Sequence, residues 1–150
     1  ALEPPLTPGA RVLDAGCGSG ILSIAAAKLG ALEVLALDID EDCVRVTRAN
    51  AAINGVAGTI RAARGSGGDD WPFDSPHAGF DVAVANIVAR VIVELAPALA
   101  GALAPGGRLI ASGIIGEREA ETRAVLEACG ARTVGVRAMG DWRCIEAERA

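Results

Sequence analysis

Three glycines at alternating positions form the first group of residues that could hold a ligand. Gly16, Gly18 and Gly20 lie in residues 14–20, which read DAGCGSG, between an apolar run expected to be a strand and a run with helical periodicity. Such glycines let the backbone approach a ligand closely, and the start of the following helix offers free N–H groups. The dinucleotide-binding pattern G-x-G-x-x-G would need a glycine at position 21, which is Ile21. The G-x-G-x-G spacing therefore fits a methyltransferase loop, whose ligand is S-adenosylmethionine, better than a dinucleotide loop. A tight turn between strand and helix without a ligand is the alternative.

Two aspartates flank this loop at the ends of expected strands. Asp38 follows the apolar residues 34–37 and lies 18 residues after Gly20. A carboxylate there can accept hydrogen bonds from both hydroxyls of a ribose. Helix capping is the alternative role of Asp38, although Asp40 is the better N-cap candidate. Asp14 either organises the glycine loop or faces the sulfonium of the cofactor, and we favour loop organisation.

An asparagine ends the fourth expected strand, beside the position where the methyl donor would lie. The side-chain carbonyl of Asn86 can accept a hydrogen bond from a substrate amine and aim the nitrogen lone pair at a methyl carbon. Because methyl transfer is an in-line displacement, such positioning would supply much of the rate. Capping of the following helix is the alternative role, and the two roles are compatible. We therefore predict that Asn86 is the catalytic residue.

The remaining candidates carry weaker signals. The loop 65–79 is rich in Gly, Ser, Asp and Pro and would lie near the adenine, where Ser66 can bind the adenine amino group. A solvated turn explains this loop equally well. His77 is the only histidine and is expected at the surface, and Trp142 is expected to pack at the sheet edge. Nothing in the sequence marks Cys17 as a nucleophile.

Strand and helix patterns alternate along the whole chain. Strands are expected at 11–14, 34–37, 59–64, 80–85, 108–112, 133–138 and 143–148, helices at 20–29, 41–53, 88–103 and 117–129, and a turn at 105–107. Such alternation predicts an α/β fold with a doubly wound, seven-stranded, mostly parallel sheet. The short turn between the last two strands makes them an antiparallel pair, so the sheet has an antiparallel closing strand. Ligands of such sheets bind beyond the carboxyl ends of the strands.

The composition is that of a single domain, residues 1–150, with a sizeable core. Hydrophobic residues make up 51% of the chain, which excludes a disordered protein. The net charge of −5, without a basic stripe, argues against direct binding of nucleic acid or of a membrane surface. The apolar stretch 80–105 is interrupted by Arg90, Glu94 and Pro97, which favours a buried strand and helix over a membrane span.

The four cysteines are widely spaced and form no Cys-x-x-Cys pair. This spacing disfavours both a disulfide framework and a zinc site, so we expect no metal. Reduced thiols are typical of the cytoplasm, which is the location that we predict. The oligomeric state stays open.

With these residues assembled, the chain closely resembles the PrmA family of methyltransferases, which modify a large-subunit ribosomal protein. The glycine loop is shared by many methyltransferases, whereas VANI together with SGI and the late Trp142 is more specific to this family. The matching segments are VLDAGCGSGILSIAA at 12–26, DID at 38–40, ANA at 49–51, NG at 54–55, VANI at 84–87, LAP at 95–97, PGGRLI at 105–110, SGI at 112–114 and GDW at 140–142.

The resemblance implies a seven-stranded methyltransferase fold, cofactor contacts at Gly16, Asp38 and Asn86, and methylation of a protein amine, at lysine or the N-terminus. The family's N-terminal domain, which recognises the ribosomal protein, and its Thr-Gly-His-His segment, which touches the cofactor, have no counterpart in these 150 residues. We therefore expect an excised catalytic domain or a shortened relative. The predicted cofactor contacts are Asp14, Gly16, Cys17, Gly18, Gly20, Asp38, Ile39, Ser66 and Asn86.

Other functions remain as alternatives. The same enzyme class can act on another protein or on a small molecule, but an Asn-Pro-Pro-Tyr motif for amide or adenine methylation is absent, because Ile87 and Val88 replace the prolines. The domain can also be a non-catalytic scaffold that binds S-adenosylmethionine or nothing. A nicotinamide-dependent oxidoreductase is the fourth alternative, and the glycine spacing argues against it.

Overall fold

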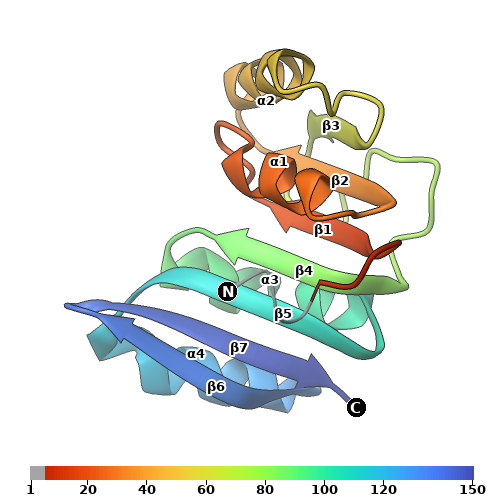
Figure 1. Ribbon diagram of the computed structural model, residues 1–150. Helices are drawn as coiled ribbons and strands as arrows, with labels where there is room; N and C mark the ends of the chain where they lie inside the picture. The colour runs from red at the N-terminus through yellow and green to blue at the C-terminus, as the bar shows by residue number, and fades with distance from the viewer. Residues whose placement is uncertain (1–5) are drawn as a thin grey trace.

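Strands and helices alternate as the sequence predicts (Figure 1). The structure is a computed structural model that describes residues 6–150. The strands are β1 (Arg11–Ala15), β2 (Glu33–Asp38), β3 (Ile60–Arg64), β4 (Phe80–Asn86), β5 (Leu103–Ile115), β6 (Ala131–Met139) and β7 (Trp142–Arg149). The helices are α1 (Ile21–Lys28), α2 (Glu41–Ile53), α3 (Ala89–Ala102) and α4 (Glu119–Ala128), with a 3₁₀ turn at Gly116–Arg118.

The strands form one seven-stranded sheet in the order β3-β2-β1-β4-β5-β7-β6. The pairs from β3 through β5 are parallel, while β7 runs antiparallel to both of its neighbours, β5 and β6. This arrangement confirms the predicted α/β fold and its antiparallel closing strand. The chain leaves β1 toward β2 on one side and reaches β4 on the other, so the carboxyl ends of β1 and β4 mark the switch point where such sheets bind ligands.

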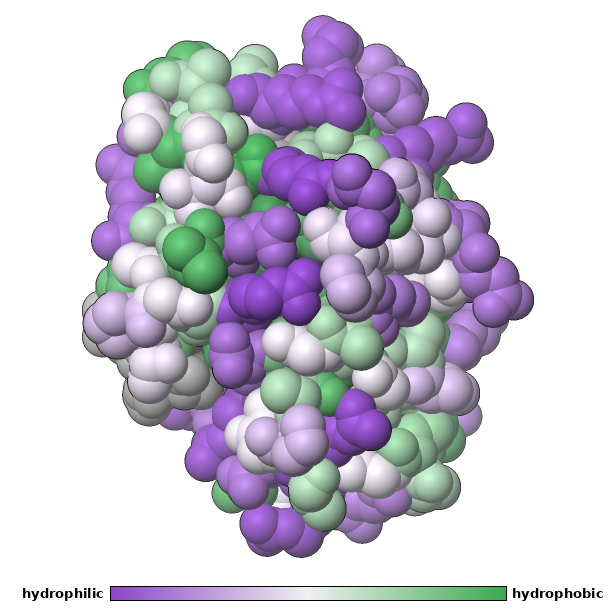
Figure 2. Space-filling model, turned by 90° about the vertical axis from the view of Figure 1, so that its right-hand side faces the viewer, coloured by the Kyte–Doolittle hydropathy of each residue, from purple (hydrophilic) through white to green (hydrophobic). Residues whose placement is uncertain are grey.

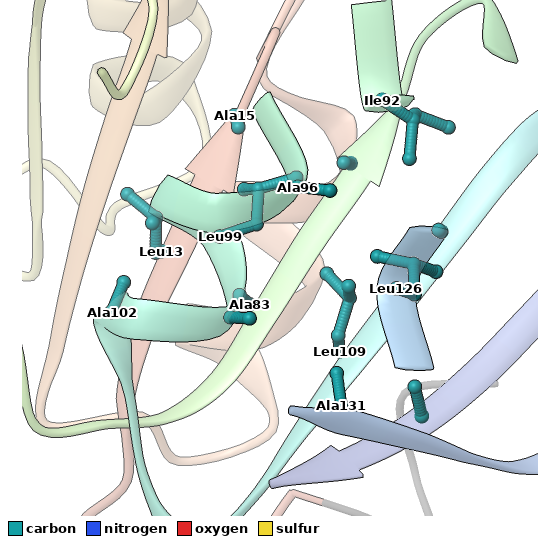
Figure 3. Close-up of a cluster of buried hydrophobic side chains, with 14 of the residues drawn as sticks. Leu13, Ala15, Ala83, Ile92, Ala96, Leu99, Ala102, Leu109, Leu126 and Ala131 are labelled. Carbon is teal, nitrogen blue, oxygen red and sulfur yellow. The ribbon is translucent and has the colours of Figure 1, made fainter. Parts of the chain in front are cut away.

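Helices cover the two faces of the sheet, and the sheet separates the hydrophobic core into two clusters. Ile92, Ala96 and Leu99 of α3 recur at helical spacing and pack over the strand residues Leu13 and Leu109 (Figure 3). The many alanines let helix and sheet approach closely. Leu99 is fully buried between them, and its truncation to Ala would leave a cavity that lowers the free energy of unfolding by about 2–5 kcal/mol. The other cluster joins α1 and α2 to the opposite face of the sheet.

The long strand β5 differs from the prediction in one respect. The expected turn at 105–107 lies inside this strand rather than before it. Leu103 pairs with Phe80 and Arg108 pairs with Val82, so residues 104–107 bulge out of the ladder. Gly106 has a φ of 76°, which a glycine adopts without strain. The turn residues therefore form an interruption of the strand, because pairing with β4 exists on both sides of them.

The edge of the molecule at which the parallel strands begin carries many hydrophilic side chains (Figure 2). Arg11 pairs there with Glu33 at 2.9 Å, and Arg61 pairs with Asp74 at 2.8 Å. Exposed pairs of this kind stabilise the fold by only about 0–1 kcal/mol each. None of the helices within residues 6–150 has the length and apolar character needed to cross a bilayer.

Candidate functional site

The loop between β1 and α1 folds tightly against the end of β2. Gly16, Gly18 and Gly20 have φ values of 76°, 55° and 84°, a region that side chains disfavour. The N–H groups of Gly16 and Cys17 both donate to the carbonyl of Leu37 at 2.8 Å. The alternating glycines are therefore required by the path of the backbone, which brings the loop to the carboxyl ends of the strands.

Asp38, the last residue of β2, holds this loop from the other side. Its Oδ2 accepts the N–H of Gly18 at 3.0 Å, and its Oδ1 accepts the N–H of Asp40 at 3.0 Å. A carboxylate offers about four lone-pair sites, so both oxygens can still accept hydrogen bonds from a ligand. Asp40 accepts the N–H of Asp42 at 2.9 Å, which confirms the prediction that Asp40 caps α2.

Asp14 lies behind the loop and not on its open side. The side chain is 1% exposed, and the hydroxyl of Ser23 on α1 donates to its Oδ2 at 2.6 Å. Burial raises the pKa of Asp14 from its ordinary 3.8 to about 6, and the hydrogen bond from Ser23 opposes this rise. Asp14 therefore joins β1 to the first turn of α1.

Two further predicted residues also support the loop from behind. The Cys17 thiol lies 3.3 Å from the hydroxyl of Thr47, which donates to the carbonyl of Gly18 at 3.0 Å. Burial raises the pKa of Cys17 to about 11, so this thiol is a poor nucleophile. A Cβ on Gly20 would lie 2.9 Å from the Cγ2 of Thr47, so Gly20 lets α2 pack against the loop.

A cavity of about 470 Å³, here called the loop cavity, opens where β1, β2, β3 and β4 end. Its volume lies within the roughly 300–1,000 Å³ of ligand pockets. The predicted residues that line it are Gly16, Gly18, Asp38, Ile39, Ser66 and Asn86, whereas Asp14, Cys17 and Gly20 do not. The lining also contains residues that the sequence patterns did not predict, namely Gly65, Ile87, Val88, Val91 and Leu95.

The first two glycines of the loop serve the cavity in different ways. A Cβ on Gly16 would lie 2.4 Å from the Cγ2 of Ile87, so Gly16 makes room for that side chain. At Gly18 an added Cβ would meet no atom within 4 Å. The backbone of Gly18 is therefore open to a ligand in the cavity, while Gly16 leaves space for Ile87, the residue that follows Asn86.

The start of the loop between β3 and β4 forms another wall. Both the N–H and the hydroxyl of Ser66 donate to the carboxylate of Asp70, at 3.0 Å and 2.7 Å. These bonds from Ser66 hold the pKa of Asp70 below its ordinary value. A tight turn thus places Ser66 and Gly65 beside the cavity.

The later part of the same loop corrects one prediction. His77 is half-buried rather than a surface residue, and its ring stacks on Trp71 with the centroids 4.1 Å apart. Burial lowers the pKa of His77, which favours the neutral imidazole. Trp71 also packs against Phe73 and Phe80, so these aromatic rings pack against the core cluster that contains Phe80.

Asn86 ends β4 and lines two cavities. Its Oδ1 accepts a hydrogen bond from the hydroxyl of Ser112 on β5 at 3.1 Å. The capping alternative was wrong, because the N-cap of α3 is Val88, which makes no side-chain capping bond. The side chain of Asn86 is therefore free of the helix and stands between the two cavities.

The second cavity, here called the hairpin cavity, has a volume of about 650 Å³. Trp142 lines it and is 58% exposed, so the prediction that this residue packs at the sheet edge was wrong. Trp142 is the first residue of β7, directly after the turn that follows β6, and its side chain lines the cavity instead. The described residues that line it are Asn86, Ser112, Gly113, Arg137, Ala138, Met139, Trp142, Arg143 and Cys144.

Some of the missed lining residues had a detectable signal. Val88, Val91 and Leu95 follow Asn86 at helical spacing, so one face of α3 could have been assigned to the loop cavity. Met139 and Arg137 had no such signal in the sequence. They lie beside the hairpin cavity only because β6 pairs with β7 and β7 pairs with β5.

The family model described as "Ribosomal protein L11 methyltransferase (PrmA)" matches residues 1–150. The chain belongs to this family. Relatives named "Ribosomal protein L11 methyltransferase" include one from Chloroflexus aurantiacus, 45% identical over 94% of this chain and 49% of its own length. Another, from Pelotomaculum thermopropionicum, is 48% identical over 86% of this chain and 40% of its own length. The chain thus spans about half the length of these relatives.

Solved structures have the same architecture. A ribosomal protein L11 methylase from Lactobacillus delbrueckii subsp. bulgaricus is 34% identical, with a TM-score of 0.86 over 96% of this chain and 71% of that one. The magnesium protoporphyrin IX methyltransferase of Synechocystis, crystallised with bound SAH, is 22% identical, with a TM-score of 0.73 over 95% of this chain and 75% of that one. The second likeness is one of fold alone.

Proposed function

We propose that this chain is the catalytic domain of an S-adenosylmethionine-dependent methyltransferase that modifies amino groups of ribosomal protein L11. The observation that carries the proposal is the position of Asn86, which lines both the loop cavity and the hairpin cavity. A group-transfer enzyme needs a donor site and an acceptor site that meet at the reacting atoms. Membership of the PrmA family supports both the chemistry and the acceptor.

The loop cavity fits the methyl donor. The carboxylate of Asp38 keeps lone pairs for two ribose hydroxyls, and the backbone of Gly18 is open to close approach. Ile39 supplies an apolar surface beside Ser66, which suits an adenine ring and its amino group. When bound, S-adenosylmethionine supplies a methyl group on a positively charged sulfur.

The hairpin cavity fits a neutral amine on an aliphatic stem. Trp142 and Met139 give it apolar walls, and no Asp, Glu or His is among its described lining residues. Arg137 is paired with Glu146 at 3.0 Å and Arg143 with Glu119 at 3.1 Å, so both cations have partners. A free lysine amine has a pKa of about 10.4, and surroundings without a carboxylate favour its deprotonated, nucleophilic form.

Asn86 orients the acceptor amine in this scheme. Its Oδ1 has one lone pair engaged by Ser112 and another available for an N–H of the amine. That hydrogen bond fixes the direction of the nitrogen lone pair toward the loop cavity. Since the described residues that line the hairpin cavity include no Asp, Glu or His, water takes the proton that the amine loses.

The charge of the chain suits a basic acceptor. A net charge of −5 attracts a positively charged protein and repels the phosphates of nucleic acid, so we propose that the enzyme acts on the protein directly. We place the reaction in the cytoplasm, because its acceptor is a ribosomal protein.

A transfer assay tests the proposal. The chain is incubated with S-adenosylmethionine carrying a labelled methyl group and with purified ribosomal protein L11, and mass spectrometry locates the label. We expect label on lysine side chains or the N-terminal amine, and far slower labelling with the Asn86→Ala variant used as control. Transfer to carboxyl or hydroxyl groups, or no transfer by a chain that binds the cofactor, would contradict the proposal.

A further inference from the structure

Ser112 and Asn86 are direct neighbours across two parallel strands. They are register partners in the pairing of β4 with β5, and the Ser112 hydroxyl donates to Oδ1 of Asn86 at 3.1 Å. We propose that Ser112 is a positioning residue that fixes the plane of the Asn86 carboxamide and thereby the direction in which it holds the acceptor amine. This inference rests on the proposed function, since Asn86 is its catalytic residue.

The geometry of an amide oxygen explains how one bond controls another. Hydrogen bonds to an sp² oxygen prefer its two lone-pair directions, which lie in the plane of the carboxamide. When Ser112 occupies one direction, the plane can no longer rotate freely, and the second direction points to a defined place in the hairpin cavity. Both residues line that cavity. The acceptor N–H therefore meets an oxygen lone pair whose orientation is already set.

Within residues 6–150, the Asn86 side chain makes no other hydrogen bond. Asn86 does not cap α3, so the helix that follows does not orient its side chain. The residue is exposed in the free chain, where an unrestrained amide would exchange between rotamers. The hydrogen bond from Ser112 is therefore the constraint that prepares the side chain before the acceptor arrives.

Ser112 lies within a bulge of β5, on the side of the strand that pairs with β7. Ala111 pairs with Ile145 of β7 and Ile114 pairs with Arg143, so β5 has one residue more than β7 in this interval. Bulges of this kind turn side chains and are frequent beside active sites. The bulge interrupts only the ladder to β7, because Ala111 and Ser112 keep their regular partners Ala85 and Asn86 on β4.

Gly113 completes the bulge. Its φ is 80°, a conformation that favours glycine. A Cβ at this position would lie 2.8 Å from the carbonyl oxygen of Ile87 and 3.2 Å from Oδ1 of Asn86. Gly113 therefore lets the backbone of β5 come close enough for the side chain of Ser112 to reach the carboxamide.

The test compares Ser112→Ala, which removes the hydroxyl, with Ser112→Thr, which keeps it. In transfer to purified ribosomal protein L11, Ser112→Ala should lower kcat about fivefold, the scale of one neutral hydrogen bond, with the KM for S-adenosylmethionine unchanged. Ser112→Thr should keep most of the wild-type kcat. Separately, ¹⁵N relaxation of the Asn86 carboxamide, identified by its loss in Asn86→Ala, should show a rigid group in the wild type and in Ser112→Thr and a mobile one in Ser112→Ala.

Two results would overturn the inference. One is a carboxamide as rigid in Ser112→Ala as in the wild type, and the other is a rate loss that Ser112→Thr shares in full, which would indicate a packing effect. Absence of transfer by the wild type would contradict the proposed function only, because the relaxation measurement needs no acceptor and still decides whether Ser112 orients Asn86. Binding of S-adenosylmethionine by each variant checks that it is folded.

Discussion

The two cavities that meet at Asn86 are built in different ways. The loop cavity lies at the ends of parallel strands, and its polar groups include the backbone of the glycine loop and the carboxylate of Asp38, beside apolar side chains such as Leu95. The hairpin cavity lies over β5, β6 and β7 and is lined largely by side chains such as Trp142 and Met139. One cavity is thus defined by the path of a loop, and the other by side chains that strand pairing brings together.

Under the proposed function, this difference separates recognition of the donor from recognition of the acceptor. Changes to side chains on the β6–β7 hairpin leave the glycine loop in place, so acceptor preference can change while the donor site is kept. Asn86 belongs to both cavities, and a change there should affect the reaction more than either binding step. The four predictions that follow test this division, from the largest expected effect to the smallest.

Replacement of Asn86 by alanine should lower kcat about 300-fold, within the range measured when one hydrogen-bonding group aimed at a transition state is lost. The Kd for S-adenosylmethionine should change less than about threefold, because Asp38 and the glycine loop are untouched. Steady-state kinetics and calorimetry on the same variant measure both. Equal losses in turnover and cofactor affinity would remove Asn86 from its catalytic role.

The buried carboxyl under the glycine loop should make stability depend on pH. The pKa of Asp14 is raised from 3.8 to about 6, so between these values the folded chain keeps a proton that the unfolded chain has lost. Stability therefore falls as pH rises through this window, by about 3 kcal/mol in total at 1.36 kcal/mol per pKa unit.

Urea unfolding at about pH 4 and about pH 7 measures this effect, with Asp14→Asn as the matched variant, which keeps an oxygen to accept the bond from Ser23. The variant should lose less stability than the wild type over the same interval. The difference between the two proteins removes the contributions of other carboxyls. An identical pH dependence in both would show that Asp14 is not the group responsible.

Replacement of Asp38 by alanine should raise the Kd for S-adenosylmethionine about 30-fold, because a carboxylate that accepts charge-assisted hydrogen bonds is lost. The loop is loosened as well, since Gly18 loses its partner. The KM for the acceptor should stay the same when the cofactor is saturating. A Kd equal to that of the wild type would place the cofactor elsewhere.

Replacement of Trp142 by alanine should raise the KM for the acceptor about tenfold, through loss of a large apolar wall, and leave the Kd for S-adenosylmethionine unchanged. Val136→Ala is the matched control, because Val136 is a partly exposed apolar residue of the same hairpin that does not line the cavity. A change in cofactor affinity without a change in KM would contradict the division between the cavities.

The same division explains what the sequence could predict. The fold followed from the alternation of strands and helices. Gly16 was identified from the alternating glycines, and Asp38 and Asn86 from their places at the ends of expected strands. Local patterns decide these features. Residues such as Asp14 and Cys17 carry the same local signal, so the sequence could not separate those that line the cavity from those that support the loop behind it.

The features that were missed depend on contacts between distant segments. The bulge at residues 104–107 and the approach of Ser112 to Asn86 follow from strand register, which the residues of one strand do not determine. Two further features form only once the sheet is assembled. His77 stacks on Trp71, and Trp142 joins the lining of the hairpin cavity. Patterns in a single sequence therefore predict much of the lining of the loop cavity but not the lining that β6 and β7 give to the hairpin cavity.

The central claim, that the glycine loop and Asp38 form a site for S-adenosylmethionine, is tested most directly by titrating the chain with S-adenosylmethionine and, separately, with NAD in a calorimeter. Saturable binding of S-adenosylmethionine at one site per chain, with no heat from NAD, is the expected result. Binding of NAD alone would contradict the claim, and binding of neither would leave a fold without the proposed cofactor site.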